Sequence, residues 1–222
     1  MTDDSGDGQG LGTKTASGTA GSRGESRAPV QSSDGFARFG AIDVLDDNAG
    51  HGHLAALEEG GDASTRMLFA TNFSSPIALI KAVLRARRAR RAGVIVNMSP
   101  FTARIPIPGT ACYAASNAAL EGASYALAEE IAPLGINVMA VEPGRVRTDF
   151  AARSIVRSVT TMDDYAQTVA GTPTTPSVPL VPKPGDPARA ARVIIKAVEA
   201  DEPVPAAAGE REPVGLRSVR AA

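Results

Sequence analysis

Two short aliphatic runs enclose one long alanine-rich segment, and this order limits the folds that the chain can adopt. The runs are 94–97 in "GVIVNMS" and 136–141 in "INVMAVEPG", and each has the apolar character of a strand covered on both faces. Between them, 113–132 has apolar residues at helical spacing and ends before a proline and a glycine. A strand, a helix and a second strand in this order form a parallel βαβ unit. The sequence therefore predicts an α/β fold with a helix-covered parallel sheet.

Further elements extend this unit in both directions. Residues 42–45 predict a strand that runs into a loop, and 63–91 predicts a helix that ends in arginines, with Pro76 inside it as a kink or boundary. A last helix is predicted to begin at Asp186, a good N-cap, with Pro187 in the first helical position.

Composition divides the chain into three parts. Residues 1–34 are rich in Gly, Ser, Thr and Asp without a helical or strand period, so we expect them to be disordered. The folded domain is expected at 35–200, with an irregular stretch at 151–184, and 201–222 is expected to be a loose tail.

Charge and cysteine content exclude several classes of function. The net charge of -1 and the pI of about 6.2 give no basic field for nucleic acid. No uninterrupted apolar run approaches the roughly 18 residues of a membrane span, and the N-terminus lacks the pattern of a signal peptide. The single cysteine, Cys112, cannot form an internal disulfide, which favours a cytoplasmic protein.

Several stretches together resemble the short-chain dehydrogenase/reductase family. They are "FGAIDVLDDNAG", "TNFSSPIALIKAVL", "GVIVNMS", "YAASNAALEGASYALAEEIAPLGINVMAVEPGRVRTDF" and "PGDPARAA", in the family's order and spacing. The resemblance implies a one-domain Rossmann fold, a doubly wound parallel sheet, that binds NAD or NADP and moves hydride between nicotinamide and a carbonyl or alcohol carbon. The family's first βαβαβ unit, with its Gly-rich pyrophosphate turn, is missing, so a partial Rossmann-like fold is expected. The glycines of "GDGQGLG" have no strand before them and no helix after them.

The resemblance assigns the catalytic positions, and two of them are changed. Tyr113 matches the tyrosine that exchanges the substrate proton, and Asn72 matches the asparagine of the preceding helix. The family's lysine, four residues after the tyrosine, is Asn117, which has no charge with which to lower the pKa of a phenol. The family's serine, thirteen residues before the tyrosine, is Pro100, which has neither a hydroxyl nor an N–H.

Structural interpretations of these residues stay open. Ser99 could replace the lost serine only through a local bulge, because a one-residue shift points a side chain to the opposite face, and Thr102 is a weaker substitute. Asn72 is equally well explained as a helix-interior group that bonds nearby backbone. Tyr113 could be a core or interface tyrosine.

The cofactor positions are also taken from the resemblance. "DNAG" matches the family's Asn-Asn-Ala-Gly turn through Asn48, Ala49 and Gly50, but Asp47 replaces the first asparagine and would repel phosphates if it faced them. "EPGRVRTDF" matches the loop beside the nicotinamide, with Pro143 and Gly144 for close backbone approach and Thr148 for a hydrogen bond. Asn117 could still bond a ribose hydroxyl.

Other motifs have plainer explanations. His51 and His53 lack partners at metal-ligand spacing, so we expect loop histidines and no metal site. "RARRARRAG" is expected to be a solvated helix end rather than a nucleic-acid patch, and Cys112 a packed small residue.

Two functions remain at the level of sequence. The first is an NAD(P)-dependent oxidoreductase with impaired activity on a small carbonyl or alcohol substrate. The alternative is an inactive pseudoenzyme or truncated gene product that acts at most as a binding or dimerisation module. A homodimer is expected through helices 63–91 and 113–132, because small residues, Ala114, Ala118 and Gly122, lie along the second helix.

Overall fold

The fold is known from a computed structural model that describes residues 15–17, 41–144, 146–158, 162–170, 185–200 and 214–219. The α-helices are α2 (Asp62–Phe69), α3 (Ser75–Arg90), α4 (Ala111–Ile131) and α5 (Pro187–Val198). The strands are β1 (Thr15–Ser17), β2 (Val44–Asp47), β3 (Gly52–Leu54), β4 (Gly93–Met98), β5 (Ile136–Pro143), β6 (Ile155–Arg157) and β7 (Val214–Val219). Short 3-10 or π-helical turns cover 70–74, 101–103, 132–134, 150–154, 163–165 and 166–170.

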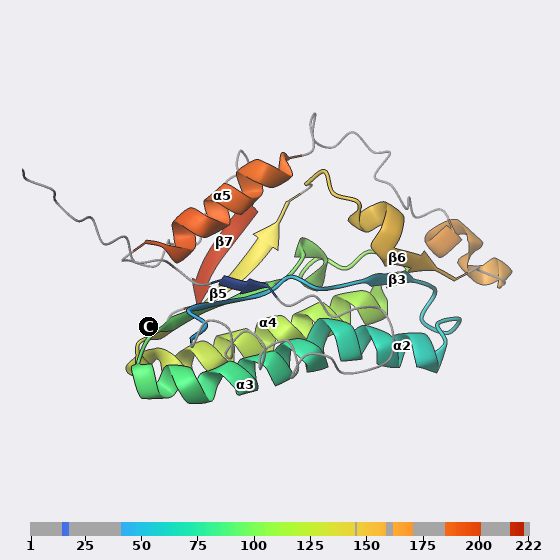
Figure 1. Cartoon of the computed structure of the whole chain (residues 1–222). Coiled ribbons are helices and arrows are strands. Elements are labelled where there is room, and N and C mark those ends of the chain that lie inside the picture. The colour runs from blue at the N-terminus through green and yellow to red at the C-terminus, as the bar shows by residue number, and fades with distance from the viewer. Residues whose placement is uncertain are drawn as a thin grey trace, which may run out of the picture.

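The main sheet has the strand order β1-β2-β4-β5-β7. The first four strands are parallel, and β7 pairs antiparallel with β5. Helices α2, α3 and α4 cover one face of this sheet and α5 covers the other (Figure 1). The predicted α/β fold with a helix-covered parallel sheet is therefore confirmed, and the three strands predicted from apolar runs are β2, β4 and β5.

Each face of the sheet has its own hydrophobic core. On the α3 and α4 side, alternate residues of the central strands, such as Leu45, Ile95 and Val138, are buried with Leu79 and Ile131 of the helices. On the α5 side the intervening strand residues, Val44, Val96 and Met139 among them, pack against the helix. The period of two in the strands thus places opposite side chains in two cores, as a doubly wound sheet requires.

The helix predicted at 63–91 is one continuous helical stretch with a π-helical turn, Ala70–Ser74, in its middle. Pro76 causes no break in this stretch, and it is the second residue of α3, just after the π-helical turn. The Ser75 N–H bonds the Ala70 carbonyl, one residue further back than in an α-helix.

By length and composition, the stretch Asp62–Arg90 is also apolar enough to cross a membrane, although polar residues interrupt its apolar runs. Its buried residues Leu79, Ile80 and Val83 lie in the core against the sheet, so we interpret it as a core helix.

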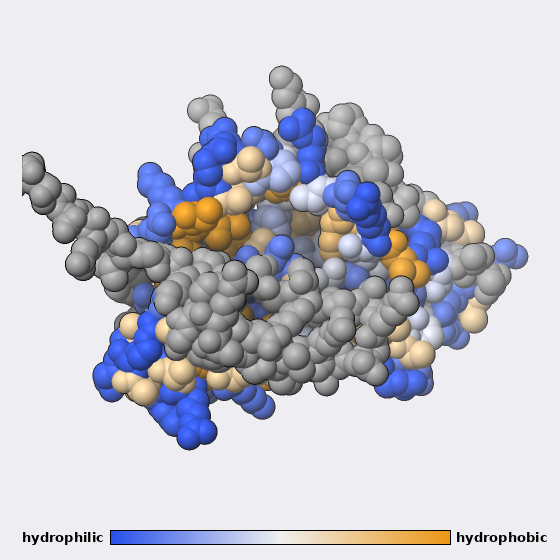
Figure 2. Space-filling model, in the orientation of Figure 1, coloured by the Kyte–Doolittle hydropathy of each residue, from blue (hydrophilic) through white to orange (hydrophobic). Residues whose placement is uncertain are grey.

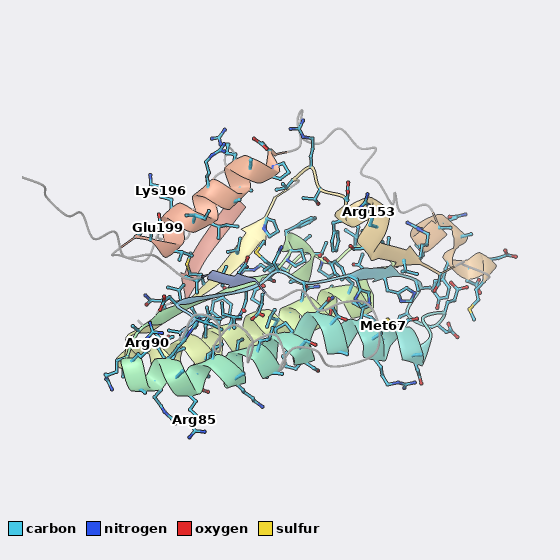
Figure 3. All side chains as sticks on the ribbon, in the orientation of Figure 1. Met67, Arg85, Arg90, Arg153, Lys196 and Glu199 are labelled. Atoms are coloured by element: carbon cyan, nitrogen blue, oxygen red, sulfur yellow. The ribbon has the colours of Figure 1, made fainter. Side chains whose placement is uncertain are left out.

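The arginines that end α3 do not all face solvent, as the sequence led us to expect. Arg85 extends away from the sheet (Figure 3), and hydrophilic residues cover this end of the helix in Figure 2. Arg87, however, is only 1 % exposed and donates to the carbonyls of Val94 at 2.9 Å and Ile42 at 3.4 Å. Burial lowers the pKa of Arg87 to about 10. Arg87 is thus a core residue that satisfies backbone where β2 and β4 begin.

Two strands lie in segments from which we expected no order. β1 is within 1–34 and pairs with β2, so it covers one edge of β2. β7 is within 201–222 and covers the outer edge of β5. The rest of both segments, and all of 171–184, lies outside the described residues.

Candidate functional site

Tyr113 lies in the first turn of α4, on the helix that the sequence predicted. Its ring contacts Phe150, with centroids 6.4 Å apart and planes tilted by 37°. Burial raises the pKa of the Tyr113 hydroxyl to about 12, and no charged group contributes to this shift. Because the pKa moves away from neutrality, the phenol is a weaker acid than a free tyrosine.

Asn117 is buried and turned onto its own helix. Its Nδ2 donates to the backbone carbonyl of Tyr113 at 2.8 Å. We expected that this amide could bond a ribose hydroxyl, and one of its two N–H donors is used one turn back along α4. An asparagine is short enough to make this local bond, which competes with longer-range contacts.

Asn72 lies in the π-helical turn before α3 and is 3 % exposed. Its Nδ2 donates to the His51 carbonyl at 3.0 Å and to Ser116 Oγ at 3.1 Å, while its Oδ1 accepts from the His51 N–H at 3.1 Å. Ser116 Oγ in turn donates to the Tyr113 carbonyl at 2.8 Å. The structure therefore connects Asn72 with Tyr113 through Ser116, and the Asn72 amide ties the loop after β2 to α4.

The two hydroxyls beside the position of the lost serine differ in their bonding. Ser99 is 1 % exposed, and its hydroxyl donates to Glu121 Oε2 at 3.1 Å. The Ser99 N–H continues the ladder to the Val141 carbonyl at 2.9 Å, so the bulge that would have turned this side chain is not formed. Pro100 is half-buried and caps the turn at 101–103, and the Thr102 hydroxyl is buried without a partner in the described chain.

The turn after β2 differs from our expectation at one residue. Asp47 is only 4 % exposed, so its carboxyl does not face outward to repel phosphates. Both its oxygens lack a hydrogen bond within the described ranges, and burial, then the charge of Asp46, raises its pKa to about 7. Asn48 and Gly50 are exposed and Ala49 is half-buried, so these three are open to a ligand at the carboxyl end of the sheet.

The loop after β5 is open in the same way. Gly144 and Thr148 are exposed and Pro143 is half-buried. The Phe150 N–H donates weakly to Thr148 Oγ1 at 3.4 Å, and the contact of Phe150 with Tyr113 brings this loop to the start of α4. These groups suit the nicotinamide end of a dinucleotide, since exposed backbone and a hydroxyl are available there. Asn117 uses one of its two amide N–H donors within α4, and its second N–H and its Oδ1 have no bond to a described residue that would occupy them.

The histidines and the cysteine form no metal site. Within the described residues there is no group of three or more His, Cys, Asp or Glu that could hold a metal ion. His53 lies in β3 rather than in a loop, is buried, and shares a 2.8 Å hydrogen bond with Ser158 Oγ. Cys112 is half-buried and accepts a weak 3.6 Å hydrogen bond from Thr65, as a packed small residue does.

Two contributions to this region did not follow from the sequence analysis. Ser116 is the link between Asn72 and Tyr113, and Arg104 pairs with Glu121 beside them. The spacing gave some signal for Ser116, since it lies three residues after Tyr113 on the same helix face. Arg104 lies in a loop, where no period predicts contacts.

Comparison with known proteins agrees with this arrangement. The oxidoreductase BOA17 of Botryotinia fuckeliana is 31 % identical over 169 residues, which cover 76 % of this chain and 61 % of that protein. A solved short-chain dehydrogenase from Streptomyces avermitilis is 38 % identical with a TM-score of 0.70, over 80 % of this chain and 64 % of that one. A metagenomic short-chain oxidoreductase in complex with NADP is 31 % identical with a TM-score of 0.52, over 54 % of this chain and 55 % of that one. The chain thus spans less than two thirds of the length of each.

The part of the chain that contains Asn72 and Tyr113 also matches the model of a protein family. The model described as short chain dehydrogenase matches residues 25–157, more than half of the chain, from before β2 to the end of β6. With the helix-covered parallel sheet and these relatives, the match shows that the chain belongs to the short chain dehydrogenase family.

Proposed function

We propose that this chain is an NAD(P)-dependent oxidoreductase of the short-chain type with impaired turnover. The observation that supports this most is the bonded path from Asn72 through Ser116 to Tyr113, beside the open loop after β5. The structure of the metagenomic relative contains NADP, which supports the same class of cofactor for this chain.

The nicotinamide end of NAD or NADP would be held by Pro143, Gly144 and Thr148. The turn of Asn48, Ala49 and Gly50 would lie beside the adenosine half. A bound nicotinamide supplies or accepts the hydride. The Tyr113 hydroxyl gives or takes the proton at the oxygen of a small carbonyl or alcohol substrate.

Impaired turnover follows from three properties of the site. The pKa of Tyr113 is raised to about 12, so the hydroxyl is poorly matched to proton transfer near neutral pH. Asn117 gives no charge to lower this pKa, and Pro100 gives no hydroxyl to orient the substrate oxygen. General acid–base help is typically worth about 10²–10⁴-fold, so a deficit of this order relative to an intact member is expected.

The competing function is an inactive relative that acts as a binding or dimerisation module. Titration of the purified chain with NADH and with NADPH, followed by nicotinamide fluorescence, separates the two. Micromolar binding supports the oxidoreductase, whereas no binding at millimolar cofactor supports the inactive relative.

A second experiment restores the two lost groups together, Asn117→Lys and Pro100→Ser. In a chain that binds cofactor, we expect the double variant to lower the pKa of Tyr113 by about 1–3 units, since a positive charge within a few ångströms has this effect. Reductase activity on a panel of small ketones should then rise. An unchanged Tyr113 pKa, followed by the absorbance of the phenolate, would contradict this account of the defect.

We further propose a cytoplasmic homodimer. The single half-buried thiol suits a reducing compartment. Ala118 and Gly122 are exposed on α4 and small enough for close helix packing, although Ala114, which we expected on this face, is 5 % exposed and packs inside the chain. Sedimentation that shows only monomer at micromolar concentration would count against the dimer.

A further inference from the structure

One arginine joins three segments around the start of α4. Arg104, in the loop between β4 and α4, donates through Nε to Glu121 Oε1 at 2.8 Å and pairs with the same oxygen through Nη2. Its Nη2 also lies 2.7 Å from the Tyr125 hydroxyl and 3.0 Å from Glu142 Oε1. The other oxygen of Glu121 accepts from Ser99.

This cluster is partly buried, with Glu121 its most buried member. The side chain of Glu121 is 9 % exposed, that of Glu142 is 20 % exposed and that of Arg104 is 29 % exposed. The pKa of Arg104 is raised, first by its hydrogen bond with Glu121. A planar guanidinium can hold several acceptors in fixed directions, which a lysine ammonium cannot do.

The three segments that Arg104 joins are those that hold the candidate site. Its own loop begins at Pro100 and leads directly into the turn of Tyr113. Glu121 lies on α4, one helical turn after Asn117, and Glu142 immediately precedes Pro143 and Gly144 on β5. One side chain therefore links the tyrosine helix to the strand end that leads into the loop proposed to hold nicotinamide.

We propose that Arg104, acting through Glu121 and Glu142, is a positioning residue that fixes Tyr113 relative to the Pro143–Gly144 loop. The effect of Arg104 on hydride transfer rests on the proposed function, whereas its effect on the position of Tyr113 does not. A 1 Å misplacement of a reacting group costs about 100-fold in rate, so a rigid link of this kind has a catalytic purpose.

A role in stability alone makes a different prediction. Replacing a buried ion pair by apolar residues of similar volume is often neutral for stability, whereas removing one partner leaves an unpaired charge. The double variant Arg104→Met with Glu121→Met therefore removes the link without leaving either member of the pair as a lone charge, although Ser99 loses its acceptor and Glu142 its contact with Arg104. The matched control replaces the ion pair at the other end of the sheet, Arg90→Met with Asp43→Met.

The experiment reads the position of Tyr113 without cofactor, by NMR of ¹³C-labelled tyrosine rings. The chain has three tyrosines and no tryptophan, so each ring signal can be assigned by substitution. Tyr165, whose hydroxyl bonds Glu58, is the internal reference. We expect the double variant to melt close to wild type, with the Tyr113 signal moved and the Tyr165 signal unmoved, while the control pair leaves both in place.

Cofactor affinity is the second readout, and we expect it to fall several-fold in the double variant. A Tyr113 signal that stays in place in the folded double variant would overturn the proposal. If the double variant does not fold, the single variant Arg104→Lys replaces it in the experiment. This variant keeps the positive charge but lacks the planar set of guanidinium donors. A moved Tyr113 signal in Arg104→Lys supports positioning, and an unmoved one overturns it. Failure of wild type to bind NADH or NADPH would instead remove the proposed function and leave the positioning result readable.

Discussion

Replacing Asp47 by asparagine should stabilise the fold at neutral and alkaline pH. Asp47 ends β2 and is the direct register partner of Asn97 on β4, so both side chains lie on the same face of the sheet. Asn97 Nδ2 donates to Ser124 Oγ on α4 at 2.7 Å, but Asn97 Oδ1 and both Asp47 oxygens have no donor among the described residues. An ionised Asp47 therefore adds a charge to a buried group of acceptors, whereas an asparagine adds an N–H donor.

The magnitude follows from the pKa. The pKa of Asp47 is raised from 3.8 to about 7 in the fold, first by burial and second by the charge of Asp46. Between these two values the unfolded chain has released its proton and the folded chain has kept it, so stability falls as pH rises. At about 1.4 kcal/mol per pKa unit, the loss approaches 4 kcal/mol by about pH 8. Below about pH 4 both states are protonated and this contribution to stability is fully present.

The assay is urea unfolding of wild type and Asp47→Asn at several pH values from about 4 to 8, followed by circular dichroism. The difference in unfolding free energy should be small at the acid end and grow in favour of the variant toward pH 8. Asp62→Asn is the control, since its carboxylate is 91 % exposed and its replacement should give no such trend. A difference between Asp47→Asn and wild type that is the same at every pH would refute the reasoning, because it would mean that Asp47 does not retain a proton in the fold.

Two further predictions concern the stability of variants at Arg87, which bonds buried backbone carbonyls, and at Gly135, which has a positive φ. Arg87→Met should cost about 2 kcal/mol in unfolding free energy, because two buried carbonyls lose a donor, while the exposed neighbour Arg88→Met should stay within about 0.5 kcal/mol. Thermal unfolding of both variants checks this, and equal melting temperatures would contradict it. Gly135→Ala should cost at least about 1–2 kcal/mol, since φ is +68° and the added Cβ would lie 2.6 Å from a backbone oxygen. Gly122→Ala, in open space on a helix, should instead be neutral or gain up to about 1 kcal/mol, and urea unfolding of the pair tests this contrast.

The elements with a strong period were predictable from the sequence. The runs in β4 and β5 and the spacing in α4 fixed their type because buried strands and amphipathic helices select different patterns. The cap of α5 was predictable too, since the Asp186 carboxylate accepts from the Ala188 N–H at 3.0 Å. β1 and β7 were not predictable, because their strand conformation depends on pairing with β2 and β5 rather than on any apolar pattern of their own.

The candidate site was predictable in its positions and less so in its contacts. Spacing placed Tyr113 and Asn117 one turn apart on one helix, and the structure agrees. The direction in which Asn117 and Ser99 bond could not be read from spacing, because each has a local or a buried partner that only the fold brings near. Arg87 was misinterpreted as solvated because arginine is rarely fully buried, although its spacing of four residues from the buried Val83 places it on the core face.

The residues of the site that remain are those that also hold the fold together. Asn72 satisfies both backbone groups of His51 and reaches α4 through Ser116, so its loss would leave buried polar groups unpaired whatever the chemistry of the site. Positions 117 and 100 do not satisfy backbone groups of another segment in this way. Among the described residues, Asn117 donates to a carbonyl of its own helix. Pro100 has no N–H that needs an acceptor. The observed pattern, with Asn72 present and the lysine and serine replaced, is therefore what stability alone would maintain. The presence of Asn72 is thus consistent with both the fold and the reaction, so cofactor binding and the titration of Tyr113 are the measurements that separate the two.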